Sequence, residues 1–101
     1  MRLTEQQRTT IREMAYKIFG LNTEVRLFGS RIDDAKRGGD IDLLIKTDMS
    51  ETMQVARAEI KFLAQLEILL GEQKIDVLLD YPSRRVYPPI FEVAHKTGLL
   101  L

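Results

Sequence analysis

Three aspartates interrupt apolar stretches of the chain, and their positions are the strongest indication of chemistry. Asp40 and Asp42 flank Ile41 at the start of an apolar run. Side chains in a strand alternate between its two faces, so these two carboxylates should point the same way. Two negative charges beside a core are unfavourable unless a cation lies between them. Asp76 interrupts a later apolar run and could add a third carboxylate, so the pattern predicts a metal site.

A glycine and a serine before the first aspartate pair suggest what the metal would serve. Gly29 has no side chain, so its backbone can approach a ligand closely. Ser30 offers a hydroxyl and an N–H at the start of a short helix expected near Arg31, where anions are favoured. Carboxylate oxygens suit Mg²⁺, and a three-carboxylate cluster can hold two ions about 3.5–4 Å apart. A phosphate-binding turn at Gly29 and Ser30 beside such a cluster predicts that a nucleoside triphosphate donates the group that is transferred.

Composition narrows the class of protein further. The chain has 101 residues, which predicts one domain spanning 1–101. Its 15 basic and 15 acidic residues cancel, so the overall charge does not favour direct nucleic-acid binding. With no cysteine and one histidine, a divalent ion would be held mainly by oxygen. No run approaches the roughly 18 apolar residues of a membrane span, and the lack of cysteine suits the cytoplasm.

The elements that must position these residues follow from hydrophobic periodicity and from turn signals. Thr4 and Gln7 form a capping-box pattern before the first helix. The apolar tail of residues 99–101 should dock on the body of the protein or on a partner. Helix, strand, strand, helix, strand and helix in this order predict a small mixed α/β (α+β) fold, with the helices mainly on one face of the sheet. The predicted ranges are helices 4–19, 51–70 and 90–96 and strands 24–28, 40–46 and 74–79.

The motif running from Phe28-Gly29-Ser30-Arg31 to Asp40-Ile41-Asp42-Leu43, with a later strand aspartate, resembles a known superfamily. It is similar to the DNA polymerase β-like nucleotidyltransferases, and in its specific form to the minimal nucleotidyltransferases (MNT proteins). The chain length and the closing helix fit that family across essentially the whole chain. Many members have ten residues between the serine and the first aspartate, whereas this chain has nine, which is a minor departure.

The resemblance implies a fold, an activity and a partner. The fold would be that of the polymerase β-like nucleotidyltransferases. MNT proteins are typically encoded beside a HEPN-domain RNase toxin, and active members use ATP and Mg²⁺ to transfer AMP to a tyrosine of that toxin. Such AMPylation makes them antitoxins. Asp76 would bind the second ion and help to deprotonate the acceptor hydroxyl. The donor-binding residues would be Gly29, Ser30 and Arg31, and the catalytic and metal-binding residues would be Asp40, Asp42 and Asp76.

Several of these residues have simpler interpretations. The aspartate pair could be a solvated strand edge, and Asp76 could pair with Lys74. Arg31 could reach a phosphate or could brace the loop by pairing with an acidic neighbour. Asp80, which precedes a Tyr-Pro pair, is predicted to be a turn former, and His95 to be structural or exposed.

Two other functions compete with AMP transfer to a toxin. One is a catalytically vestigial antitoxin that neutralises the toxin by steric binding alone. The other is nucleotidyl transfer to a different acceptor, such as RNA or a small molecule. The leading interpretation predicts a hetero-oligomer with the toxin, and a homodimer is possible.

Overall fold

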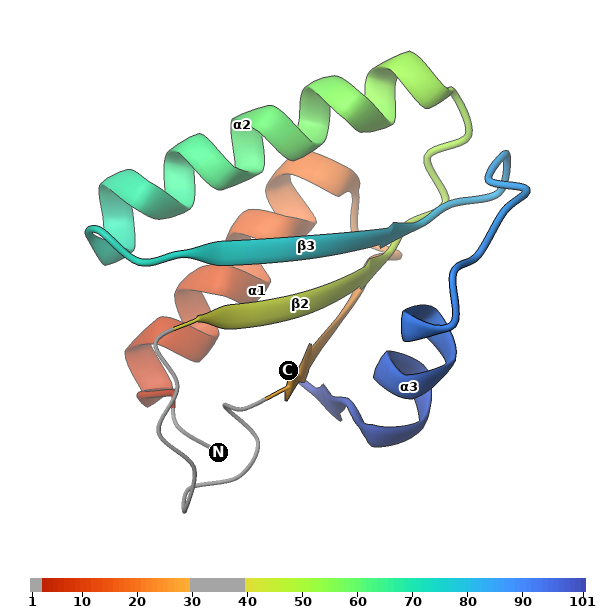
Figure 1. The fold of residues 1–101 in the computed structure, drawn as a ribbon. Coiled ribbons are helices and arrows are strands. Elements are labelled where there is room, and N and C mark those ends of the chain that lie inside the picture. Colours follow the sequence, from red (N-terminus) through yellow and green to blue (C-terminus); the bar gives the residue numbers. More distant parts are fainter. Residues whose placement is uncertain (1–2, 30–39) are drawn as a thin grey trace.

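The computed structural model describes residues 3–29 and 40–101, which form three helices and a four-stranded mixed sheet (Figure 1). The strand order is β3-β2-β1-β4. Strand β1 pairs antiparallel with β2 and β4, whereas β2 and β3 are parallel. The α/β (α+β) class is therefore confirmed, and every predicted bound lies within one residue of the observed one. The elements are α1 (Glu5–Phe19), β1 (Glu24–Phe28), β2 (Ile41–Lys46), α2 (Thr52–Leu70), β3 (Ile75–Asp80), α3 (Ile90–Thr97) and β4 (Leu99–Leu100).

Helix α1 begins at the predicted capping box. The Thr4 hydroxyl accepts a hydrogen bond from the Gln7 backbone N–H at 3.0 Å, and the Gln7 side chain accepts one from the Thr4 N–H at 2.9 Å. Both bonds satisfy N–H groups near the helix start. The helix then buries Ile11, Ala15 and Phe19, which recur at the spacing of one helical face.

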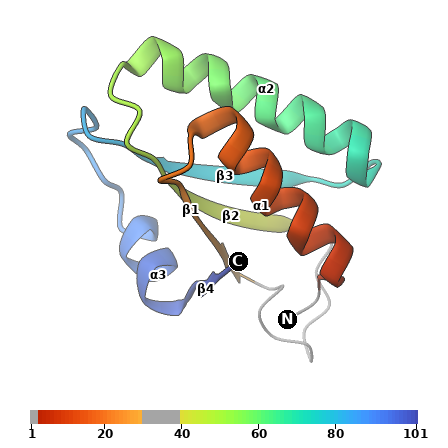
Figure 2. The same cartoon turned by 180° about the vertical axis from the view of Figure 1, so that it is seen from behind.

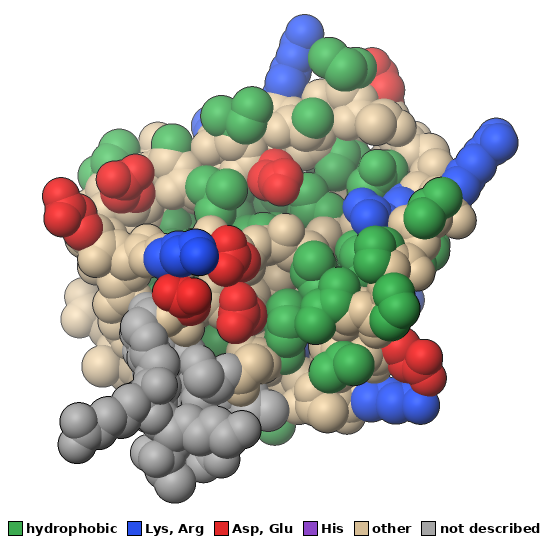
Figure 3. All heavy atoms as spheres, viewed as in Figure 1, with side chains coloured by type: hydrophobic (Ala, Val, Ile, Leu, Met, Phe, Trp, Pro, Cys, Tyr) green, Lys and Arg blue, Asp and Glu red, His purple; other side chains and the backbone are tan. Residues whose placement is uncertain are grey.

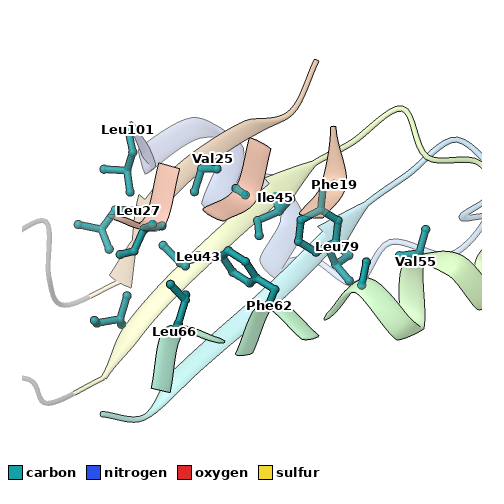
Figure 4. Close-up of a cluster of buried hydrophobic side chains, with 14 residues drawn as sticks. Phe19, Val25, Leu27, Leu43, Ile45, Val55, Phe62, Leu66, Leu79 and Leu101 are labelled. Carbon is teal, nitrogen blue, oxygen red and sulfur yellow. The ribbon is translucent and has the colours of Figure 1, made fainter. Parts of the chain in front are cut away.

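The helices cover the two faces of the sheet unequally. Figure 2 shows α1 and α2 together on one side of the sheet and the short α3 on the other. The larger core lies under α1 and α2, where Phe62 and Leu66 point toward the sheet (Figure 4). A smaller cluster joins Phe28 and Leu44 of the sheet to Phe91 and Ala94 of α3. The prediction that helices pack mainly on one face is thus confirmed, and part of the other face is available for a site.

Helix α2 is apolar on more than its core-facing side. Val55, Phe62 and Leu66 are buried, whereas Ile60 and Ile68 are 70% and 73% exposed. Within the described ranges, none of the helices combines the length and the apolar character that a membrane crossing requires.

The apolar C-terminal tail docks on the body of the protein. Leu99 and Leu100 form β4 against β1, and Leu101 is buried in the larger core. Helix α1 holds this tail from the other side, because Arg8 Nη2 donates to the Leu100 carbonyl at 3.2 Å and Arg12 Nη1 donates to the Leu101 carbonyl at 2.9 Å. The sequence left open whether the tail docks on the body of the protein or on a partner, and the structure shows it on the body.

Candidate functional site

Two of the three predicted site aspartates lie side by side on neighbouring strands. Asp42 of β2 and Asp76 of β3 are register partners in the parallel pair. Both belong to the alternation that includes Leu44 and Leu78, whose side chains join the smaller cluster beneath α3. The two carboxylates therefore lie on the less covered face of the sheet, near the beginning of both strands. The neighbouring positions of each strand supply the larger core, which fixes this orientation.

Gly29 lies directly against Asp42. Its φ of +76° belongs to the left-handed region that glycine tolerates and other residues rarely adopt. A Cβ at this position would collide with the Asp42 carboxylate oxygen Oδ2 and would lie 3.2 Å from Cγ. The close approach expected of Gly29 is thus present, but the group that it approaches among the described residues is the Asp42 carboxylate.

The surroundings of Asp42 disfavour its ionised form. Partial burial raises its pKa first, and the negative charges of Asp76 and then Asp40 raise it further. Lys74 acts in the opposite direction and lowers the pKa of Asp42. The ionised carboxylate is therefore under-compensated by the protein, because one partly effective lysine faces three acids.

Asp40 is drawn into an ion pair. Lys74 Nζ lies 3.9 Å from its Oδ2, and both side chains are largely exposed. The sequence allowed a pair between Lys74 and Asp76, whereas the structure shows Lys74 beside Asp40. Within residues 3–29 and 40–101, no three His, Cys, Asp or Glu side chains are arranged so that they could hold a metal ion. Among the described residues, the three aspartates thus do not form a closed ligand set. Figure 3 shows acidic side chains gathered beside a basic side chain on this face.

Ser30 and Arg31, together with the short helix expected near them, lie outside the described residues. Their assignment to the triphosphate stays a prediction. Of the predicted site residues, the structure describes Gly29, Asp40, Asp42 and Asp76.

Asp80 is not the turn former that the sequence predicted. It is the last residue of β3, where its backbone carbonyl accepts a hydrogen bond from the Thr47 N–H at 2.9 Å. Its carboxylate accepts a bond from the Tyr87 hydroxyl at 2.7 Å and lies 3.3 Å from His95 Nε2. The pKa of Tyr87 is raised mainly because its protonated hydroxyl donates this hydrogen bond to Asp80.

The donor set is chemically suited to a hard divalent cation. Asp40, Asp42 and Asp76 offer only carboxylate oxygens, which Mg²⁺ prefers. A cation would also offset the repulsion and burial that raise the pKa of Asp42. The tight space between Gly29 and Asp42 leaves room for backbone but not for a side chain. The chemistry of these carboxylates therefore suits a cation, although among the described residues they are not arranged as a closed ligand set.

No protein-family model matches the chain, and a search of the curated proteins finds no match.

Proposed function

We propose that this chain is a minimal nucleotidyltransferase of the DNA polymerase β-like type, which transfers AMP from ATP to a tyrosine of a HEPN-domain toxin and so acts as an antitoxin. The observation that carries the proposal is the pairing of Asp42 with Asp76 on adjacent parallel strands, with Asp40 two residues before Asp42. Carboxylates on two neighbouring strands of the less covered face suit a phosphoryl-transfer site, because a substrate must reach the metal ligands. The close packing of Gly29 on Asp42 supports the same proposal.

In the proposed reaction, the acceptor hydroxyl oxygen attacks the α-phosphorus of ATP and pyrophosphate leaves. A new P–O bond forms to the acceptor, and the bond between the α-phosphorus and the bridging oxygen breaks. Asp40 and Asp42 would hold Mg²⁺, and Asp76 would share a second ion and accept the acceptor's proton. The bound Mg²⁺ would neutralise charge on the phosphates. The chain's own residues contribute mainly by positioning and by electrostatics.

The test is transfer of radiolabel from ATP to the product of the neighbouring gene. Label in the α-phosphate should appear on the acceptor, whereas label in the γ-phosphate should leave as pyrophosphate. Asp42→Asn should lower the rate by about 10²–10³-fold, the loss typical of removing one charge-stabilising group. Glu13→Gln is the matched control, because Glu13 is an exposed carboxylate on α1, across the sheet from the aspartates. Equal rates for wild type and Asp42→Asn would refute the catalytic role.

A catalytically vestigial antitoxin is the competing proposal. The observation that favours it is the ion pair between Lys74 and Asp40, which engages one of the three carboxylates within the protein itself. Changing Asp40, Asp42 and Asp76 together to Asn separates the two proposals in a toxin-rescue assay. Rescue by this variant would favour steric binding, and loss of rescue by a folded variant would favour catalysis.

A further inference from the structure

The two edges of the sheet differ in how well they are protected. On one edge, β4 is only two residues long, and Arg8 binds the carbonyl groups of its end. On the other edge lies β3, six residues long, and within the described part of the chain no strand pairs with its outer side. Strand β3 has no proline or lysine and shows a regular register with β2. Long, regular edges of this kind are templates for pairing with another strand.

The backbone groups that β3 leaves on its outer side can be identified from its ladder with β2. The Lys74 carbonyl accepts from the Ile41 N–H at 2.9 Å, and the Asp80 carbonyl accepts from the Thr47 N–H at 2.9 Å. In a parallel ladder alternate residues of one strand bond to the same neighbour, so the even-numbered residues of β3 face β2. The odd-numbered residues Ile75, Val77 and Leu79 therefore direct their N–H and C=O groups outward. Of these groups, the Leu79 carbonyl accepts a long bond of 3.5 Å from Arg84 Nη1.

We infer that β3 pairs with β3 of a second copy of this chain, antiparallel about a two-fold axis at Val77, to form one continuous sheet. This register places Val77 opposite Val77 of the second copy and Ile75 opposite Leu79. All three outward-facing residues then occupy hydrogen-bonded positions of an antiparallel ladder. The inference rests on the edge of the sheet alone and stands independently of the proposed function.

The side chains of β3 are self-complementary in this register. On the face with the larger core, the three pairs are all aliphatic, formed by Ile75, Val77 and Leu79. On the other face, Lys74 comes opposite Asp80 of the second copy, and Asp76 comes opposite Leu78. No two like charges face each other directly, which would destabilise a sheet. Charge complementarity thus favours a second copy of this chain over an unrelated apolar strand.

The surface beside β3 is hollowed, but Leu79 is only 6% exposed and the Arg84 side chain lies against its carbonyl, so Arg84 would have to move away for a strand to pair there. A cavity of about 270 Å³ lies along its edge, lined by Val77 and Leu79 of the strand, Glu59 of α2, and Arg84. Burial raises the pKa of Glu59, and Arg84 opposes this shift. Figure 3 shows apolar side chains in the hollow between α2 and β3. Side chains of the second copy would fill this hollow.

Cysteine cross-linking tests the register directly, because the natural chain contains no cysteine. Two copies of Val77→Cys would have Cα atoms about 5.5 Å apart, within the range of a disulfide. Two copies of Ile75→Cys, four residues out of register, would be about 13 Å apart and beyond reach. Mild oxidation should therefore give a disulfide-linked dimer of Val77→Cys, whereas Ile75→Cys should form no disulfide link between the two copies. Equal cross-linking of both variants would overturn the proposal.

Sedimentation velocity on the full chain tests the association without a cross-link. Val77→Pro removes an outward N–H and no bond of the ladder with β2, so it should raise the dimer dissociation constant at least about tenfold. Ile75→Pro, at the first position of the strand, provides a second variant if Val77→Pro does not fold. Ile60→Lys is the control for association through the exposed side of α2, and it should leave the dimer unchanged. A wild-type chain that stays monomeric at every concentration, or a dimer lost in Ile60→Lys and kept in both proline variants, would overturn the proposal.

Discussion

Replacing Gly29 by alanine should destabilise the protein through two separable effects. The first is conformational, because the φ of +76° is unfavourable for any residue with a side chain. The second is steric, because the new Cβ would collide with the Asp42 carboxylate. The same substitution at Gly71 carries only the first effect, since its φ is +82° and nothing lies within 4 Å of a Cβ there. Gly71→Ala therefore serves as a comparison for the cost of a side chain at positive φ without a steric clash.

The two effects have different expected magnitudes. A non-glycine residue held in such a conformation costs about 1–3 kcal/mol. Overpacking against a well-fixed group adds about 1–3 kcal/mol. Gly29→Ala should therefore lower the free energy of unfolding by about 2–6 kcal/mol, and Gly71→Ala by about 1–3 kcal/mol. For a domain of this size, each kcal/mol corresponds to about 4–8 °C in Tm.

Urea unfolding followed by circular dichroism would measure both costs. A double-mutant cycle with Asp42→Ala isolates the steric part, because removing the carboxylate should reduce the cost of Gly29→Ala by about 1–3 kcal/mol. If Gly29→Ala costs no more than Gly71→Ala, and Asp42→Ala does not change that cost, then the close packing of Gly29 on Asp42 is wrong.

Three other perturbations test the titration of Asp42 and two close contacts elsewhere in the fold. Because the pKa of Asp42 is raised above its ordinary value of 3.8, the folded state binds its proton more tightly than the unfolded state does. The stability that Asp42 contributes is thus fully present below its pKa in the unfolded state and is lost as the pH rises through its pKa in the folded state. Urea titrations of the metal-free protein at a series of pH values should show this loss. In Asp42→Asn this part of the pH dependence should be absent. Gly98→Ala should cost about 1–3 kcal/mol by overpacking, since its Cβ would collide with a carbonyl of α3 and lie 3.1 Å from Arg26 Cβ; an unchanged Tm would contradict this close contact. Thr4→Ala should lower the free energy of unfolding by about 1 kcal/mol through loss of the cap. If Gln7→Ala lowers it as much in the Thr4→Ala background as in the wild type, the two capping bonds are not coupled.

The fold could be predicted closely from the sequence because its signals are local and mutually consistent. The Thr4–Gln7 capping box and the apolar spacing of Ile11, Ala15 and Phe19 define α1 without reference to the rest of the chain. The alternation around Asp42 likewise predicted a strand with carboxylates on one face. What the sequence left open was the docking of the tail, because an apolar terminal segment indicates burial but not the surface that buries it.

The electrostatic details of the site could not be predicted because they depend on tertiary geometry. Asp42 and Asp76 are far apart in sequence, and only the parallel pairing of β2 with β3 sets them in register. Lys74 precedes Asp76 closely, yet its ion pair is with Asp40. Asp80 preceded a turn signal, but the ladder with β2 kept it in the strand, where it binds the Tyr87 hydroxyl. In each case a contact across strands or elements decided the outcome.

The measurement that tests the central proposal most directly is AMP transfer by wild-type protein and by Asp42→Asn, with ATP, Mg²⁺ and the neighbouring gene's product. The intact mass of the acceptor, followed over time, reports transfer without assuming which residue is modified. We expect the wild type and Glu13→Gln to add AMP at the same rate, and Asp42→Asn to be slower by about 10²–10³-fold. An acceptor that gains AMP equally fast with Asp42→Asn, or gains none with the wild type, would contradict the proposed nucleotidyltransferase.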